Sequence, residues 1–152
     1  FSLDNLWDGL GALVVDYPKI KYFFGKVTMY PDYNKMGRDL ILGFLSYFFP
    51  NKENWIEAKN PLKGHHDISF FIKKIENLEY KLAYKELIKS LRDLECSLPP
   101  LIAAYMNLSL TMRSFGTALN TNFGQVEETG ILISIEDIYS EKKDRHINTY
   151  IK

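Results

Sequence analysis

The chain has 152 residues, of which 46% are apolar, and its 19 basic side chains balance its 19 acidic ones. A chain of this length folds as one domain and buries roughly two-thirds of the surface that its unfolded form exposes. The neutral formal charge argues against a dedicated nucleic-acid-binding protein, because such proteins carry a net basic face. The single cysteine, Cys96, excludes an intramolecular disulfide and a zinc site built on several thiolates. We therefore expect a reducing, cytoplasmic environment and no metal.

No pattern within these 152 residues predicts a targeting signal or a membrane span. No stretch approaches the ~18–20 consecutive apolar residues that a membrane-spanning helix needs. The chain opens at Phe1, inside a pattern that already indicates a helix, and no basic segment precedes an apolar run as in a signal peptide. We expect a cytoplasmic chain that is one part of a longer protein.

The first half of the chain predicts a helix, a strand and a second helix. Apolar side chains recur at helical spacing over residues 3–15, and Pro18 ends that helix. Residues 22–29 are mostly apolar, which predicts a strand buried on both faces. Helical spacing returns over residues 36–48 and stops before Pro50.

The second half begins with an irregular stretch over residues 51–66, interrupted by Asn60-Pro61 and Lys63-Gly64. Further elements are predicted, in order, as a helix over 77–93, a short helix from Pro99 to about Leu108, strands over 110–120 and 130–135, and a helical turn or two after Glu136. Helices and strands mixed in this way predict one α/β domain over residues 1–152.

Four stretches of the chain resemble, in order and spacing, the motifs of one family. They are Leu6-Trp7-Asp8-Gly9-Leu10-Gly11, the strand and turn from Tyr22 to Tyr33, Asn60-Pro61-Leu62, and Leu98-Pro99-Pro100 with Phe123-Gly124 and Gly130-Ile131-Leu132-Ile133. Together they resemble the hemolysin-like N-acyltransferases of the GNAT superfamily, which include the ornithine-lipid and glycine-lipid synthases. The resemblance covers nearly the whole chain and corresponds to the C-terminal part of the family's fold.

The resemblance implies a GNAT-like mixed sheet flanked by helices. It implies transfer of a (3-hydroxy)fatty acyl group from acyl carrier protein or CoA to the amine of an amino acid in bacterial aminolipid synthesis. The implied donor group is the phosphopantetheine thioester, and the implied partners are acyl carrier protein and the amino-acid acceptor. Peripheral contact with the inner membrane is a further expectation. A partial fold leaves a strand edge unpaired, which predicts a homodimer or a rearranged sheet.

Acyl transfer to an amine requires a deprotonated amine, donors for the tetrahedral oxyanion, and a proton for the leaving thiolate. In a GNAT-like site a splayed strand supplies the oxyanion donors. The resemblance therefore places binding of the acyl donor on Gly25, Lys26, Val27, Thr28 and Met29. Glycine permits close approach of a ligand to the backbone, but a glycine needed only for packing is equally consistent with Gly25.

The resemblance gives Tyr33 the role of the catalytic acid that protonates the thiolate, with Tyr30 as the weaker rival. Lys35 and Arg38 follow in the next helix and are assigned to the donor's phosphate or to the acidic surface of a carrier protein. A solvated helix face is the favoured alternative for these two cations.

The remaining chemical side chains have simpler explanations. His65-His66-Asp67 has the composition of a general base with an orienting carboxylate, but a surface loop is the favoured interpretation. His146 lies in the polar tail, which predicts solvent exposure. Cys96 is interpreted as a buried structural thiol rather than a nucleophile.

Two classes of function stay open. The first is the N-acyltransferase. The alternative is a non-catalytic GNAT-derived module that binds a partner protein or a membrane surface. The family's Asp-Pro-Asp-Phe segment reads Asn120-Thr121-Asn122-Phe123 here, a departure that supports the alternative.

Overall fold

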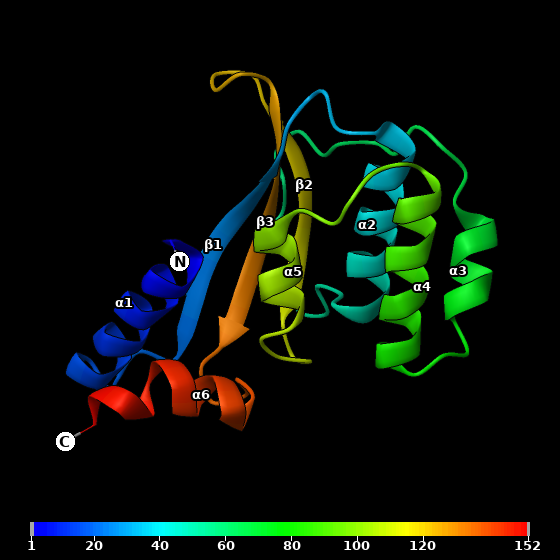
Figure 1. Ribbon diagram of the computed structural model, residues 1–152. Coiled ribbons are helices and arrows are strands. Elements are labelled where there is room, and N and C mark those ends of the chain that lie inside the picture. The colour runs from blue at the N-terminus through cyan, green and yellow to red at the C-terminus, as the bar shows by residue number, and fades with distance from the viewer. Residues whose placement is uncertain (1, 152) are drawn as a thin grey trace.

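The computed structural model describes residues 2–151, with side chains from Asn5 to Ile151. These residues form a three-stranded sheet and six α-helices (Figure 1). The elements are α1 (Ser2–Asp16), β1 (Tyr22–Met29), α2 (Lys35–Phe48), α3 (Ser69–Ile75), α4 (Tyr80–Asp93), α5 (Pro100–Met106), β2 (Arg113–Asn120), β3 (Val126–Ser134), α6 (Ser140–His146) and a final 3-10 turn (Asn148–Tyr150). The predicted mixed α/β class is confirmed.

The sheet is antiparallel throughout, with β3 in the centre and the order β1-β3-β2. Val27 of β1 and Thr117 of β2 both pair with Thr129 of β3, which fixes the register of all three strands. The β2–β3 connection turns through Gly124, whose φ of 61° is a conformation that glycine adopts readily. Among the described residues β1 pairs with β3 alone, so one edge of β1 has no partner strand.

Burial along β1 differs from the sequence prediction. Val27 and Met29 are buried, whereas Tyr22 and Phe24 are 47% and 55% exposed. Strand side chains alternate between two faces, and no layer of described residues fully covers the face that carries Tyr22 and Phe24. The prediction of burial on both faces is therefore wrong for β1.

The core lies between the sheet and the helices of its other face. Helix α2 contributes the buried side chains Leu40, Ile41, Phe44 and Leu45, because its apolar positions recur at helical spacing. Asn34 caps this helix by accepting a hydrogen bond from the Gly37 N–H at 3.0 Å. In Figure 1, α2, α3 and α4 stand together on one side of the sheet, and α5 lies between them and α1.

Several element boundaries differ from the prediction. The sequence pattern missed α3, since a helix of seven residues with two buried side chains shows no clear period. Helix α4 begins at Tyr80 instead of residue 77, and β2 at Arg113 instead of residue 110. Strand β3 begins at Val126, before the predicted Gly130, because polar Glu127 and Thr129 occupy inward positions.

Helices α1 and α6 pack against each other near the two ends of the described chain (Figure 1). A Cβ atom on Gly11 would overlap the backbone oxygen of His146, so only glycine permits this approach. His146 is 8% exposed, and its Nδ1 lies 2.7 Å from Asp8 Oδ1. The prediction that His146 is solvent-exposed is wrong, because α1 covers it. None of the described helices has the length and apolar character needed to cross a membrane.

Candidate functional site

A groove runs between the β1–α2 connection and the α4–α5 connection. Its volume is about 980 Å³, within the usual range for small-molecule sites. Residues that line it include Thr28, Met29, Tyr33, Cys96, Ser97 and Pro100. We call this the Tyr33 groove. Three residues that the family resemblance assigned to the site, Thr28, Met29 and Tyr33, thus lie on one surface.

Tyr33 is held at the wall of the groove by its hydroxyl, which donates a hydrogen bond of 2.7 Å to the Ser97 carbonyl oxygen. Burial, reinforced by the neighbouring Cys96 thiol, raises the pKa of the Tyr33 phenol well above its ordinary value. The phenol therefore keeps its proton across the neutral range. To donate to a ligand, the hydroxyl must exchange its bond to Ser97.

Cys96 lies beside Tyr33 and is half-buried. Its thiol donates a hydrogen bond of 3.4 Å to the Leu91 carbonyl oxygen. A Cβ on Gly37 would come within 2.6 Å of Cys96 Sγ, so the thiol packs tightly against the start of α2. These contacts agree with a structural thiol, which here also lines the groove.

The five β1 residues assigned to the acyl donor are divided between two faces of the sheet. Val27 and Met29 point into the core, while Lys26 forms an ion pair of 2.7 Å with Glu128 across the strand. The hydrogen bond from Lys26 lowers the pKa of the Glu128 carboxyl below its ordinary value. Because side chains alternate between the two faces, the five residues share no side-chain surface. Alternate backbone groups among them face the edge of β1 that has no partner strand within the described residues.

Gly25 is approached closely by a side chain of this chain. The Tyr105 hydroxyl of α5 lies 3.1 Å from the position that a Cβ of Gly25 would occupy. Burial raises the pKa of the Tyr105 phenol. Trp7 of α1 meets the same ring edge-to-face at a centroid distance of 5.4 Å. The glycine thus allows α5 to pack on β1, which is the packing interpretation of Gly25.

Arg38 lies at the centre of a buried group of charges. It is 1% exposed, and its Nη1 donates a hydrogen bond of 2.6 Å to Glu127 Oε1. Its Nε and Nη2 both donate to Asp39 Oδ1, at 2.9 and 2.8 Å. Lys35, which is partly exposed, adds a contact of 3.1 Å to Glu127 Oε1. A solvated face is therefore wrong for Arg38, whose guanidinium is fully committed to two internal carboxylates.

Asp39 connects this group to the loop that holds the adjacent histidines. Its Oδ2 accepts hydrogen bonds of 2.9 Å from the backbone N–H groups of His65 and His66, and His66 Nδ1 lies at the same distance. Burial opposes ionisation of Asp39, but the hydrogen bonds from His66, Arg38 and the two N–H groups lower its pKa on balance. The loop is at the surface, as predicted, and is fastened to a buried carboxylate. We call Lys35, Arg38, Asp39, His66 and Glu127 the charge cluster.

Sequence reasoning missed Asp39 and Glu127, although a signal was present for each. Arg38 falls on the helical stripe of Ile41 and Leu45, which predicts that it is buried and needs a carboxylate partner. Glu127 lies two positions from buried Thr129 along β3, and therefore on the same face of the strand. The second oxygen of Glu127, Oε2, is buried without a hydrogen-bond partner among the described residues. Within residues 5–151, no three His, Cys, Asp or Glu side chains come together as they would around a metal ion.

The chain is 51% identical to the glycine N(alpha)-acyltransferase of Phocaeicola vulgatus over 156 aligned positions, which cover the whole chain and 47% of that enzyme. It is 50% identical to the glycine N(alpha)-acyltransferase of Bacteroides thetaiotaomicron, again over the whole chain and 45% of the enzyme. These similarities support an acyltransferase family.

The chain spans about half the length of the acyltransferases that it matches. No family model matches it, and no solved structure does. The similarity extends over the Tyr33 groove and the charge cluster, since it covers every residue of the chain.

Proposed function

We propose that the protein containing this chain is an N-acyltransferase that transfers a fatty acyl group to the amine of glycine. The observation that carries the proposal is the identity of 51% and 50%, over the whole chain, to two enzymes named glycine N(alpha)-acyltransferase. The proposed fold is GNAT-like, of the hemolysin-like type, with this chain as its C-terminal part. The proposed pathway is bacterial aminolipid synthesis.

In this proposal the reaction is direct transfer without a covalent enzyme intermediate. The amine nitrogen attacks the thioester carbonyl carbon, and the C–S bond breaks as the tetrahedral intermediate collapses. The amine loses a proton and the thiolate gains one. Backbone N–H groups along the free edge of β1, from Gly25 to Met29, are the proposed oxyanion donors.

Tyr33 is the proposed acid for the leaving thiolate. Its position in the groove beside Thr28 and Met29 supports this role. A thiol has a pKa of about 8.5, below that of a buried phenol, so Tyr33 stabilises the thiolate chiefly by donating a hydrogen bond. Full proton transfer to the sulfur then follows as the thiolate departs and solvent re-enters.

The proposed donor is an acyl group on the phosphopantetheine of acyl carrier protein, or acyl-CoA. Of the two cations assigned to the donor, Lys35 has the exposure needed to meet a phosphate. Arg38 supports it indirectly, because both cations share Glu127 Oε1. Further proposals are a cytoplasmic location, peripheral contact with the inner membrane, and pairing of two copies.

The test is an acylation assay on the full-length protein. It is incubated with 3-hydroxyacyl carrier protein or acyl-CoA and a panel of amino acids, and products are identified by mass spectrometry. The expected product is N-acyl glycine. No product from either donor, with donors and acceptors shown to be sound, would instead favour a non-catalytic module that binds a partner protein or a membrane surface.

A further inference from the structure

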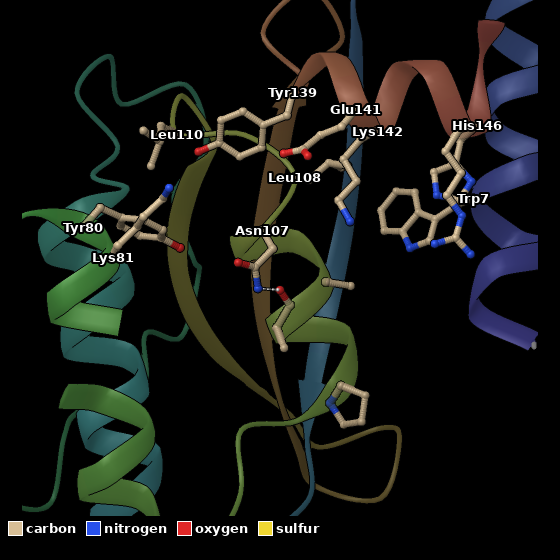
Figure 2. A pocket seen from close by; sticks show the side chains of 14 residues that line it. Trp7, Tyr80, Lys81, Asn107, Leu108, Leu110, Tyr139, Glu141, Lys142 and His146 are labelled. Atoms are coloured by element: carbon tan, nitrogen blue, oxygen red, sulfur yellow. Dashed lines mark hydrogen bonds between the residues drawn. The ribbon is translucent and has the colours of Figure 1, made fainter. Parts of the chain in front are cut away.

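A second groove lies on the exposed side of α5, separate from Tyr33. Its volume is about 920 Å³. Figure 2 shows Tyr80 and Lys81 of α4 on one side and Trp7 and Lys142 on the other, with α5 between them. We call this the α5 groove.

The floor of the α5 groove is apolar and built from small side chains. Pro100, Ala103 and Ala104 place no long side chain on this face of the helix, and Leu108 follows at its end. Asn107 adds one amide to the floor, and its Nδ2 donates a hydrogen bond to the Ala103 carbonyl oxygen. Leu110 is 51% exposed beside it. The floor therefore offers a smooth aliphatic surface on which an extended hydrocarbon chain loses contact with water.

The rim of the α5 groove carries the cations Lys81 and Lys142, together with the carboxylate residue Glu141 beside Lys142. Lys81 and Lys142 stand on opposite sides, and among the described residues neither has a carboxylate within ion-pair distance. Lys142 is half-buried, and its stem packs beside Trp7 and Leu10. A lysine that packs its stem along apolar surface keeps its ammonium group in solvent, where it is available to an anionic ligand.

We propose that the α5 groove binds a long-chain anionic amphiphile, with its aliphatic chain on the α5 floor and its carboxylate at the rim that carries Lys81 and Lys142. An N-acyl amino acid has this chemistry. Pro100 lines both this groove and the Tyr33 groove, so the two grooves meet at the start of α5. The identification of the ligand as the enzyme's own product rests on the proposed function, whereas the binding site itself does not.

The test is equilibrium binding of N-palmitoylglycine to the full-length protein, by calorimetry below the concentration at which the lipid forms micelles. Lys81→Gln and Lys142→Gln are each expected to weaken binding about tenfold, as loss of a hydrogen bond to a charged group does. Lys89→Gln is the matched control, since Lys89 is exposed on α4 and lies outside the groove. Unchanged affinity in both groove variants would overturn the site.

Two further ligands separate the parts of the proposal. N-acetylglycine, which has the carboxylate without the chain, is expected to bind at least about 100-fold more weakly. N-palmitoylglycinamide has the chain without the charge. It is expected to bind the wild type more weakly than N-palmitoylglycine does, by about the same factor as the lysine substitutions weaken binding. Equal binding of N-acetylglycine would mean a small-anion site, and binding only to anionic vesicles would mean a membrane surface; either result overturns the proposal.

Tryptophan fluorescence locates the chain of the ligand. Trp7 lines the α5 groove, whereas Trp55 stacks with Arg113 at 4.4 Å, near Tyr22. An amphiphile with a brominated acyl chain is expected to quench the wild type and Trp55→Phe, and to lose that quenching in Trp7→Phe. Quenching that persists in Trp7→Phe would place the chain elsewhere. This readout does not depend on catalysis. A protein that binds the amphiphile but shows no acyltransferase activity would therefore contradict the proposed function and leave the α5 groove site intact.

Discussion

At the scale of single residues, Tyr33 combines a groove position with a phenol that stays protonated. Its hydroxyl donates a hydrogen bond to the Ser97 carbonyl oxygen and lies beside the Cys96 thiol. Removing the hydroxyl therefore changes stability by only about 1 kcal/mol. The chemical consequence is expected to be much larger than the structural one.

Tyr33→Phe is predicted to lower kcat about 100-fold, with little change in KM for the acceptor, because the hydrogen bond forms to sulfur as negative charge develops. Steady-state kinetics with the acyl donor measure this. Tyr17→Phe is the control, since Tyr17 is 59% exposed outside the groove. If Tyr33→Phe keeps the wild-type kcat, Tyr33 is not the acid, and Tyr30 becomes the candidate.

The charge cluster makes a second prediction for single residues. Arg38→Met leaves Asp39 and Glu127 buried without their shared cation, and is predicted to lower the free energy of unfolding by about 3–5 kcal/mol. Denaturant titration measures the change. Arg92→Met, on the exposed end of α4, is expected to stay within about 0.5 kcal/mol of the wild type. Equal effects of the two substitutions would contradict the assignment of the cluster to stability.

Asp39 is predicted to make the free energy of unfolding depend on pH in the acidic range. Its folded-state pKa is lowered relative to the unfolded value of about 3.9. The stabilisation is therefore complete above that value and is lost as the pH falls through the folded pKa. The difference in unfolding free energy between wild type and Asp39→Asn is predicted to shrink as the pH is lowered from about 6 to about 2. A difference that is constant over this range would show that Asp39 is not linked to acid stability.

At the scale of elements, α1 and α6 are joined through a contact that depends on the absence of a side chain. The Gly11 backbone in α1 contacts the His146 backbone in α6, and the His146 imidazole contacts Asp8, which is also in α1. Ordinary helix packing leaves room for at least a methyl group between backbones. This pair of helices is therefore closer than their residue pattern indicates.

Gly11→Ala is predicted to destabilise the protein by at least about 2 kcal/mol, because α1 and α6 must separate. Gly9→Ala is a matched control in the same helix, since a Cβ there meets nothing within 4 Å. It is expected to be neutral or to stabilise by up to about 1 kcal/mol through better helix propensity. Thermal unfolding of both variants measures the difference. Similar melting temperatures for Gly11→Ala and Gly9→Ala would contradict the close packing of α1 on α6.

At the scale of the whole molecule, the sheet ends at β1, where backbone groups have no partner strand among the described residues. Such an edge tends to pair with another chain or segment. The exposed rings of Tyr22 and Phe24 on the same strand add apolar surface. Both features favour association through β1.

The 152-residue chain is predicted to self-associate, with Phe24→Lys shifting it toward monomer because a charged edge strand resists pairing. Sedimentation analysis measures the populations. Phe70→Lys is the control, since Phe70 is 50% exposed on α3, away from the sheet. A wild-type chain that stays monomeric at all concentrations would count against pairing at this edge.

Regular patterns in the sequence were enough to predict most elements. The helical spacing of α2 and the apolar run of β1 are local properties, and both elements appear within a residue or so of the predicted bounds. Helix α3 was missed because two buried positions are too few to define a period. Tyr33 could be named from a family resemblance, but its contact with Ser97 could not, because 64 residues separate the two.

By itself, the sequence determined the mixed α/β class, the order of the long elements and the similarity to acyltransferases. Only the tertiary structure decided which charges are buried together, since Arg38 and Glu127 are 89 residues apart and the local pattern indicates at most that each lies on a buried face. The burial of His146 depends likewise on α1, at the other end of the chain. The physical reason is the same in each case. Periodicity reports the face on which a side chain lies, whereas its partner is set by elements that meet only when the chain folds.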